Sequence, residues 1–306
     1  MNYRELYEEG VKELLWDEDA KLDARLLLEE VCGTDLQTLL VYPETKITPE
    51  QEDRYRKLIA RRCAREPVAM ILQRADFMGL TFRVTGDVLI PRQDTEILAE
   101  LAVKALKDKL AGGGDADFLD LCTGSGCILI SAVYHALAGA PAGAGSHIHA
   151  VGTDISAASL KVAAGNETVL QDNSGSSTDR AHISWLEGDL FEALEKNEGA
   201  HPSRFDIIVS NPPYIPTDVI GTLEPEVRDK EPARALDGGA DGLVFYRRIA
   251  AGIRQYLKKN GIIILEIGYD QAASVSAVFE QAGFGSIELY RDYGGNDRVL
   301  VIKCRE

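Results

Sequence analysis

The sequence of 306 residues predicts an α/β domain built on a parallel sheet, preceded by a small bundle of helices. From about residue 118 onward, short apolar runs alternate with amphipathic stretches of helical period. The first of these runs leads through a Gly-x-Gly turn into a second apolar stretch. Before residue 70, apolar residues recur at helical spacing instead. This alternation is typical of a sheet with helices packed on its faces.

The first 70 residues predict four helical segments. Two of them have apolar residues at helical spacing: Tyr3, Tyr7, Val11 and Leu14, then Ala24, Leu27, Leu28 and Val31. Thr34 with Gln37, and Thr48 with Gln51, have the spacing of capping boxes, and Pro49 suits a first helical position. Pro67 is expected to end the fourth segment.

The stretch from Val68 to Ile90 shifts toward the period of strands. Residues 77–80 and 81–84 predict a hairpin that links the bundle to the sheet. Asp94 then has the position of an N-cap for a helix over 95–110, and Gly112-Gly113-Gly114 ends that helix.

The first predicted ligand-binding feature is the turn Gly124-Ser125-Gly126, which follows the strand Phe118–Leu121. Glycines between a strand and a helix let a ligand approach the backbone at a helix N-terminus. The next strand, Ile148–Thr153, ends in Asp154, where a carboxylate would meet the hydroxyls of a ribose. The interval from Gly124 to Asp154 exceeds the ~20 residues that usually separate these two features. The Gly/Ala-rich insert 139–145 accounts for the additional residues. Leu129 stands where a dinucleotide fingerprint has its third glycine, which argues against NAD and for S-adenosylmethionine.

The second feature is the loop Asn211-Pro212-Pro213-Tyr214, which follows the apolar strand Phe205–Ser210. Each proline fixes its own φ and restricts the residue before it, so Asn211 cannot continue into a helix. The Asn211 side-chain oxygen and the Pro212 carbonyl oxygen then form two acceptors at a fixed spacing, which suits a planar NH2 group. Tyr214 offers a flat face to stack on the group that carries this nitrogen. The alternative is an ordinary turn followed by a core tyrosine.

The remaining elements complete the predicted sheet. We expect a helix from Asp154 to about residue 170, a polar loop over 171–179, and a strand over 183–186 that reaches Gly188-Asp189-Leu190-Phe191. Residues 215–232 have no clear period and predict a long loop beside the pocket. The last expected elements are a helix over 242–256, a strand over 262–267, a helix over 271–282, and an antiparallel pair over 286–290 and 298–303.

Composition restricts the function. The formal net charge of −16 argues against a nucleic-acid enzyme, which usually carries a basic surface, and favours a protein substrate. No apolar run reaches the ~18 residues of a membrane span. The five cysteines form no C-x-x-C pair, which favours reduced thiols in a cytoplasm over disulfides or zinc.

In order along the chain, several motifs resemble the HemK/PrmC family, the peptide chain release factor glutamine methyltransferases. They are Phe77-Met78-Gly79-Leu80, Leu89-Ile90-Pro91-Arg92, Asp94-Thr95-Glu96, Gly124-Ser125-Gly126, Asp154, Gly188-Asp189-Leu190-Phe191, Asn211-Pro212-Pro213-Tyr214 and the run 235–243. The resemblance covers essentially the whole chain. Two positions depart from the family pattern: Cys122, where a glycine is usual, and Gln93, where a proline is usual.

The resemblance implies a Rossmann-like, seven-stranded S-adenosylmethionine-dependent methyltransferase fold over 91–306. It also implies a helical release-factor-binding domain over 1–72 and a hairpin linker over 73–90. The implied activity is methyl transfer from S-adenosylmethionine to the side-chain amide of the glutamine in the Gly-Gly-Gln motif of class I release factors, without a metal. We expect a cytoplasmic monomer that binds neither nucleic acid nor membrane.

The resemblance also implies roles for individual residues. The loop Pro91–Glu96 would border the pocket, Asp189 would accept from the adenine amine, and Leu190 would pack on the ring. The expected cofactor residues are Cys122, Thr123, Gly124, Ser125, Gly126, Asp154, Asp189, Leu190 and Asn211. The expected substrate residues are Asn211, Pro212, Pro213 and Tyr214, of which Asn211, Pro212 and Tyr214 would be catalytic. The alternatives are a nucleic-acid amino-methyltransferase acting on DNA adenine or rRNA guanine, a dehydrogenase, and a non-catalytic adaptor that binds the cofactor.

Overall fold

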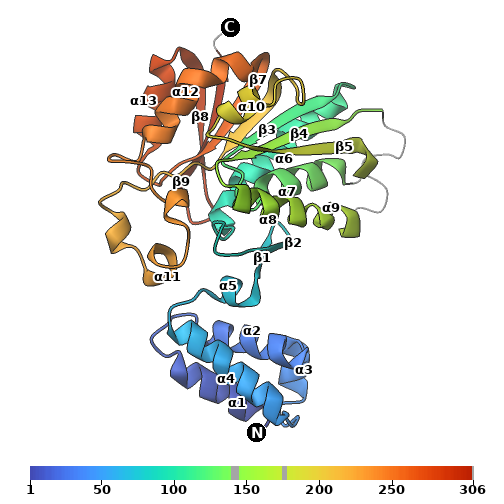
Figure 1. Ribbon diagram of the computed structural model, residues 1–306, viewed down its shortest axis with the longest axis vertical. Helices are drawn as coiled ribbons and strands as arrows, with labels where there is room; N and C mark the ends of the chain where they lie inside the picture. The colour runs from blue at the N-terminus through green and yellow to red at the C-terminus, as the bar shows by residue number, and fades with distance from the viewer. Residues whose placement is uncertain (139–144, 174–177, 305–306) are drawn as a thin grey trace. The chain divides into compact units, whose positions relative to one another are not determined.

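The computed structural model describes residues 1–138, 145–173 and 178–304. The chain divides into two compact units. The helical unit comprises Met1–Arg74 together with Glu224–Lys230, and the sheet unit comprises Ala75–Leu223 and Glu231–Glu306. The segment 224–230 belongs to the helical unit, although its neighbours on both sides in the chain belong to the sheet unit. Figure 1 labels the helices and strands of both units.

The helical unit is an amphipathic bundle around an apolar core. Its helices are α1 (Tyr3–Glu13), α2 (Ala20–Cys32), α3 (Leu36–Val41), α4 (Pro49–Cys63), α5 (Val68–Leu72) and the short α11 (Pro225–Arg228). The predicted capping box of Thr48 and Gln51 is confirmed at the start of α4. The one predicted at Thr34 is wrong: Asp35 caps α3 and accepts from the Thr38 N–H at 2.7 Å, since its carboxylate reaches the orphan donor that Thr34 does not.

The hairpin β1 (Arg74–Phe77) and β2 (Leu80–Arg83) follows the bundle. Its turn residues Met78 and Gly79 both have positive φ, at 50° and 73°, as a tight two-residue turn requires. The hairpin was predicted correctly, but its strands begin and end a few residues from the expected positions. Residues 68–72, expected to start the strand region, form the helix α5 instead.

A sheet of seven strands forms the centre of the sheet unit, in the order β5-β4-β3-β6-β7-β9-β8. The strands are β3 (Ala116–Leu121), β4 (Ile148–Asp154), β5 (Ala181–Glu187), β6 (Phe205–Ser210), β7 (Leu257–Glu266), β8 (Phe284–Arg291) and β9 (Asp297–Cys304). Strand β9 runs antiparallel to both of its neighbours, and the five strands from β5 to β7 are parallel. The Rossmann-like seven-stranded fold, with its predicted antiparallel pair at the end of the chain, is confirmed.

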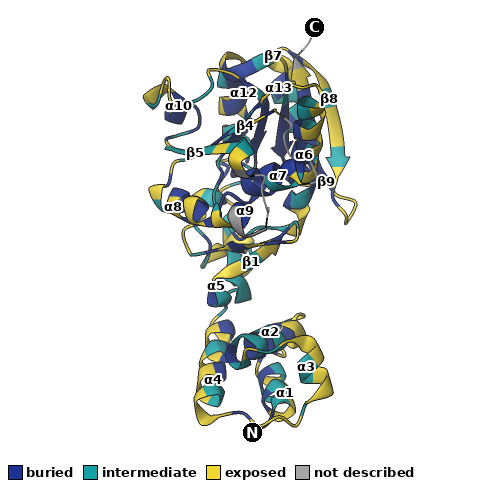
Figure 2. Ribbon diagram, turned by 90° about the vertical axis from the view of Figure 1, so that its right-hand side faces the viewer, coloured by how far each residue is buried: buried dark blue, intermediate teal, exposed yellow. Residues whose placement is uncertain are grey.

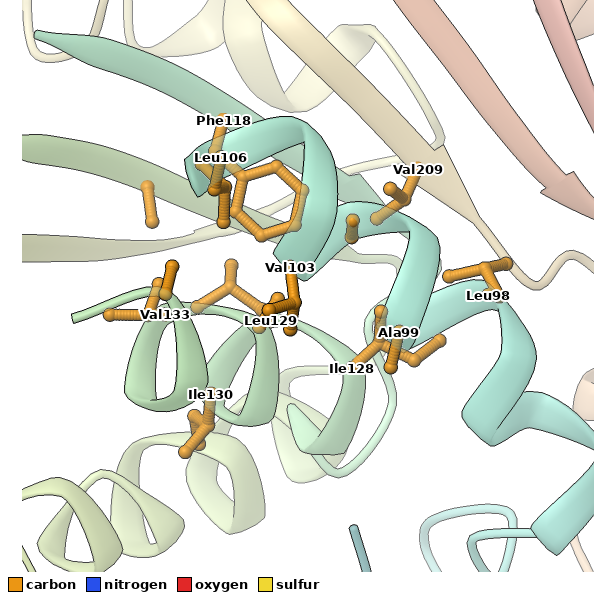
Figure 3. Close-up of a cluster of buried hydrophobic side chains, with 14 of the residues drawn as sticks. Leu98, Ala99, Val103, Leu106, Phe118, Ile128, Leu129, Ile130, Val133 and Val209 are labelled. Carbon is orange, nitrogen blue, oxygen red and sulfur yellow. The ribbon is translucent and has the colours of Figure 1, made fainter. Parts of the chain in front are cut away.

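Helices cover both faces of this sheet, and the residues between them are buried (Figure 2). Helices α6 (Glu96–Ala111) and α7 (Cys127–Leu137) pack on one face, where side chains of both helices meet Phe118 of β3 and Val209 of β6 (Figure 3). Helices α12 (Val244–Tyr256) and α13 (Ala272–Gln281) contribute to a second core that includes the other side of the same strands. The remaining helices of the sheet unit with more than one turn are α8 (Ala157–Asn166), α9 (Thr168–Asn173) and α10 (Glu192–Lys196).

Three other expectations differ from the structure. Asp94 does not cap α6, because a 3₁₀ turn over Gln93–Thr95 precedes this helix and the Asp94 carboxylate pairs with Arg298 at 3.1 Å. The single helix expected after Asp154 is divided into α8 and α9. Residues 215–232 contain short helices, one of which is α11. Most of the insert 139–145 and part of the loop 171–179 lie outside the described residues.

Candidate functional site

A cavity with an empty volume of about 1110 Å³, part of it open to solvent, lies at the carboxyl ends of the parallel strands. This edge is where open α/β sheets bind ligands. All residues that line the cavity belong to the sheet unit. It brings together Cys122, Thr123, Gly124 and Ser125 after β3, Asp154 at the end of β4, Gly188, Asp189 and Leu190 after β5, and Asn211 and Pro213 after β6. Four separate predicted motifs therefore face one space.

The turn after β3 is built on left-handed backbone. Gly124 and Gly126 have φ of +56° and +77°, which glycine adopts without strain. A Cβ at Gly126 would lie 3.0 Å from the Trp185 ring and 3.1 Å from Ile130, so the residue also allows close packing at the start of α7. Cys122 has a φ of +60°, which explains why a glycine is usual there. Gly126 itself does not line the cavity.

Asp154 joins this turn to the next strand. Its two carboxylate oxygens accept from the Gly124 N–H at 3.0 Å and from the Ser156 N–H at 2.8 Å. Each oxygen keeps a second lone pair, so the carboxylate can still accept from two vicinal hydroxyls. Burial raises the pKa of Asp154, although the two N–H donors oppose this.

A buried carboxyl that sequence reasoning did not assign to the site lies below the turn. Asp120 is fully buried near the end of β3, where its Oδ2 accepts from the Thr123 hydroxyl at 2.6 Å. Its Oδ1 has no hydrogen-bond partner among the described residues, and neither has the Thr153 hydroxyl. Burial raises the pKa of Asp120 to about 7. The signal in the sequence was a carboxylate between two leucines, Leu119 and Leu121, in a buried strand.

The motif after β5 contributes Asp189 and Leu190. Leu190 adopts a φ of +53°, an uncommon conformation that is found most often at functional sites. The Asp189 carboxylate pairs with Arg248 of α12 at 2.8 Å, and Arg248 and Phe245 also line the cavity. Neither residue of α12 was predicted, because nothing in the sequence indicates that this helix passes the end of β5.

The Asn-Pro-Pro-Tyr loop begins directly after β6. Asn211 and Pro213 line the cavity, and the Asn211 Nδ2 donates to the Thr95 hydroxyl at 3.4 Å. Pro212 is buried and, like Tyr214, does not line the cavity. The Tyr214 hydroxyl donates to Glu266 Oε1 at 3.3 Å, and the Tyr214 carbonyl accepts from the Gln271 side chain at 3.0 Å. The structure therefore anchors Tyr214 in the protein and places Asn211 at the cavity.

Two further segments close the cavity. Residues 87–92 contribute one side, and the predicted entry loop is confirmed there by Pro91, Arg92 and Thr95. The other side includes Pro232, Arg234 and Ala235. The Glu231 carboxylate, almost fully buried, connects the two, because it pairs with the Arg92 guanidinium and accepts from the Ile90 N–H at 3.1 Å. The sequence did not predict that the exposed Arg234 lines the cavity, nor that Glu231 connects its two sides.

The polar groups of the cavity suit a nucleoside that carries a charged amino acid. Within the described residues, no three histidine, cysteine or carboxylate side chains are grouped so that they could hold a metal ion. The cavity offers a carboxylate at Asp154 and a second carboxylate at Asp189. None of the described helices has the length and apolar character to span a membrane.

Comparison with protein families gives two matches. The model described as PrmC N-terminal domain matches residues 5–72, and the model described as N-6 DNA Methylase matches residues 79–229. The second match includes the Asn211 loop and covers about half of the chain.

The similarity to curated proteins extends over most of the chain. A protein of Agrobacterium fabrum named release factor glutamine methyltransferase is 40% identical over 285 residues, which are 93% of this chain and 91% of that protein. Proteins of the same name from Caulobacter vibrioides and Geobacter sulfurreducens are 39% and 38% identical; the matches cover 92% of this chain in both cases, and 88% and 89% of those proteins. Together with the cavity and its loops, this similarity shows that the chain belongs to the release factor glutamine methyltransferase family.

Proposed function

We propose that this enzyme transfers a methyl group from S-adenosylmethionine to the side-chain amide nitrogen of the glutamine in the Gly-Gly-Gln motif of class I release factors. The observation that carries the proposal is that Asn211 faces the same cavity as Gly124 and Asp154. The side-chain amide of Asn211 thus lies at the same cavity as the turn to which we assign the cofactor. The similarity to release factor glutamine methyltransferases over most of the chain supports the choice of protein substrate.

The cofactor roles follow from the chemistry of each lining residue. Asp154 would accept from the ribose hydroxyls, while Asp189 would accept from the adenine amine and Leu190 would pack on the ring. The turn of Cys122, Thr123, Gly124, Ser125 and Gly126 would let the amino-acid part of the cofactor lie against the backbone. The cofactor supplies an electrophilic methyl group on a sulfonium, so the protein need not provide a leaving group.

The substrate roles follow from the weakness of an amide nitrogen as a nucleophile, since its lone pair is delocalised into the carbonyl. The Asn211 Oδ1 and the Pro212 carbonyl would accept the two amide hydrogens. This would orient the nitrogen toward the methyl group and stabilise the positive charge that develops on it. Pro213 would keep the loop extended, and the proton would leave to water after transfer. Tyr214 would hold the loop in place through its contact with Glu266.

The other expectations on partners also belong to this proposal. We place the helical unit, including residues 1–72, in contact with the release factor, and we expect a monomer that binds neither nucleic acid nor membrane. The cysteines 32, 63, 122 and 127 are free in the structure, which fits a reducing cytoplasm.

Mass spectrometry tests the proposal. A class I release factor incubated with the enzyme and S-adenosylmethionine should gain a single methyl group, on the glutamine of its Gly-Gly-Gln motif. Asn211→Ala should lower kcat by on the order of 100-fold or more. Its affinity for S-adenosylhomocysteine, measured by calorimetry, should stay close to that of the wild type. No methyl on the release factor, or full activity of Asn211→Ala, would contradict the proposal.

A further inference from the structure

A buried carboxylate joins two walls of the cavity. Glu231 exposes only 1% of its side chain, and the two segments that it joins, 87–92 and 232–235, both contribute lining residues. Its Oε2 accepts from the Ile90 N–H at 3.1 Å, and its Oε1 pairs with the Arg92 guanidinium. Glu231 does not line the cavity itself, so its effect on a ligand there must pass through these partners.

The wall that follows Glu231 in the chain is attached to the substrate loop. Its end pairs with the residue that comes directly after Tyr214: the Ile215 N–H donates to the Leu236 carbonyl at 3.0 Å, and the Gly238 N–H donates to the Ile215 carbonyl at 2.8 Å. Backbone hydrogen bonds therefore fix this wall, and Glu231 is anchored at its start.

The opposite wall depends on Glu231 for its position. Pro91 has no N–H, and the backbone N–H groups of Leu89 and Arg92 have no partner among the described residues. The Ile90 N–H lies between them, and its acceptor is Glu231. Apart from apolar packing, this carboxylate is therefore what holds the stretch in place.

The burial of Glu231 gives this link its strength. A carboxylate removed from water is stable only while it keeps its charged and hydrogen-bonding partners. Both partners that Glu231 has among the described residues lie on the 87–92 wall. Opening of the wall would remove both at once and leave a buried charge unpaired, so the closed wall is favoured even without a ligand.

We propose that Glu231 is a positioning residue for cofactor binding: through Ile90 and Arg92 it holds the 87–92 wall closed, so that the cavity is formed before S-adenosylmethionine enters. This inference rests on the proposed function, because that function assigns the cavity to the cofactor. Without Glu231 the wall is closed only part of the time, and the apparent affinity falls by the fraction of molecules in which it is closed.

Calorimetry with S-adenosylhomocysteine tests the effect on affinity. Glu231→Ala removes both contacts, and the dissociation constant should rise by on the order of 10-fold, as expected when the wall is closed in about a tenth of the molecules. Glu231→Gln keeps an acceptor for the Ile90 N–H and should show a smaller rise. Arg92→Met should cost less affinity in the Glu231→Ala background than in the wild type, because the two residues act as a pair.

Hydrogen exchange of the Ile90 amide, followed by NMR in the ligand-free enzyme, separates positioning from general stability. In Glu231→Ala this amide should exchange on the order of 10-fold faster, because its acceptor is gone and the wall opens locally. The amide of Ile208, in the buried strand β6, should exchange as in the wild type. A carboxylate that only stabilised the fold would instead change both amides together.

Asp206→Asn is the matched control. Asp206 has the same chemistry as Glu231: its Oδ2 accepts from the Asp117 N–H at 3.0 Å and pairs with Lys258 at 2.7 Å. It lies near the start of β6, at the edge of the sheet opposite to the cavity. This variant should keep the wild-type affinity for S-adenosylhomocysteine and the wild-type exchange of Ile90, even if its melting temperature falls.

Two results would overturn the inference. One is wild-type affinity for S-adenosylhomocysteine in Glu231→Ala, and the other is unchanged exchange of Ile90 in that variant. Both would leave the proposed function intact, because methylation of the release factor by the wild-type enzyme is measured separately. A wild-type enzyme that does not methylate the release factor would instead contradict the proposed function, whereas the exchange of Ile90 is measured without any ligand or substrate.

Discussion

At the level of single residues, the left-handed backbone of the glycine turn limits which residue types the position of Cys122 can hold without strain. Cys122 adopts a φ of +60°, in a region that costs a non-glycine residue about 1–2 kcal/mol. Its side chain is small and unbranched, which keeps this cost low. Burial raises the pKa of its thiol, so the residue stays neutral beside Asp154 and Asp120.

This strain predicts opposite effects for two substitutions. Cys122→Val places a β-branched residue in left-handed backbone and should lower the free energy of unfolding by about 1–2 kcal/mol, with weaker cofactor binding. Cys122→Gly removes the strain, so its free energy of unfolding and its cofactor affinity should be at least as high as those of the wild type. Urea denaturation and calorimetry with S-adenosylhomocysteine check this. Equal stability of the two variants would show that the turn relaxes freely.

Asp120 predicts how stability depends on pH. Its ordinary pKa is near 3.8 and burial raises it to about 7, so between these values the folded protein binds more protons than the unfolded chain. The contribution of Asp120 to stability is thus fully present below pH 3.8 and is lost as the pH rises through 7, by up to about 1.4 kcal/mol per pH unit. Glu266 acts with the same sign.

Asp120→Asn should remove the contribution of Asp120 to the pH dependence of the free energy of unfolding. Urea denaturation of both proteins between pH 5 and 7.5 should show a shallower loss of stability in the variant, and the variant should gain relative to the wild type as the pH rises. Parallel curves would mean that the Asp120 carboxyl does not change its protonation on unfolding in this range.

At the level of elements, α11 is held in the helical unit by charge. Arg62, 8% exposed at its side chain, pairs with Asp17, with Asp23 at 2.6 Å and with Glu226 of α11 at 3.0 Å. Arg65 also reaches Glu226, at 3.2 Å. A segment of the chain that follows the substrate loop is thus fixed by a residue of α4.

Breaking this cluster should release α11. Arg62→Met leaves three carboxylates without their shared cation and should destabilise the helical unit by about 3–5 kcal/mol. Glu226→Gln should cost about 1 kcal/mol, because Arg62 keeps two partners. In both variants, hydrogen exchange of the Arg228 and Asp229 amides should accelerate, since these donate to Glu224 and Pro225 within the released segment. Arg54→Met, which removes a more exposed pair with Glu30 and no contact to α11, is the control; unchanged exchange in Arg62→Met would contradict the role of the cluster.

The same elements show what sequence can and cannot predict. Strands and helices followed from apolar period, and the Gly124, Asp154 and Asn211 motifs followed from local chemistry, because each lies at the end of a strand. Thr34 and Asp94 were misread as caps because the true ends of the helices depend on backbone turns of one or two residues. Glu266 and α11 could not be found, since their partners are distant in sequence and meet only when the sheet and the bundle form.

At the level of the whole molecule, net charge distinguishes a protein substrate from the alternative of a nucleic-acid substrate. The family model described as N-6 DNA Methylase also matches the Asn-Pro-Pro-Tyr loop, so the loop alone does not distinguish a carboxamide substrate from a nucleobase amine. Proteins that bind nucleic acid without sequence preference do so by neutralising phosphates, with dissociation constants of about 10⁻⁴–10⁻⁶ M at physiological salt. A chain with a formal net charge of −16 repels such a polymer as a whole.

We therefore expect no measurable binding of duplex DNA or ribosomal RNA by the enzyme at micromolar concentration, even at 50 mM salt, where phosphate contacts are strongest. An excess of either polymer should leave the rate of release factor methylation unchanged, and labelled S-adenosylmethionine should transfer no methyl group to it. Fluorescence anisotropy of a labelled duplex and scintillation counting of the recovered nucleic acid measure the two effects. Binding that weakens steeply with salt, together with label in the nucleic acid, would reveal a local basic groove and support the nucleic-acid alternative, because only phosphate contacts produce that salt dependence.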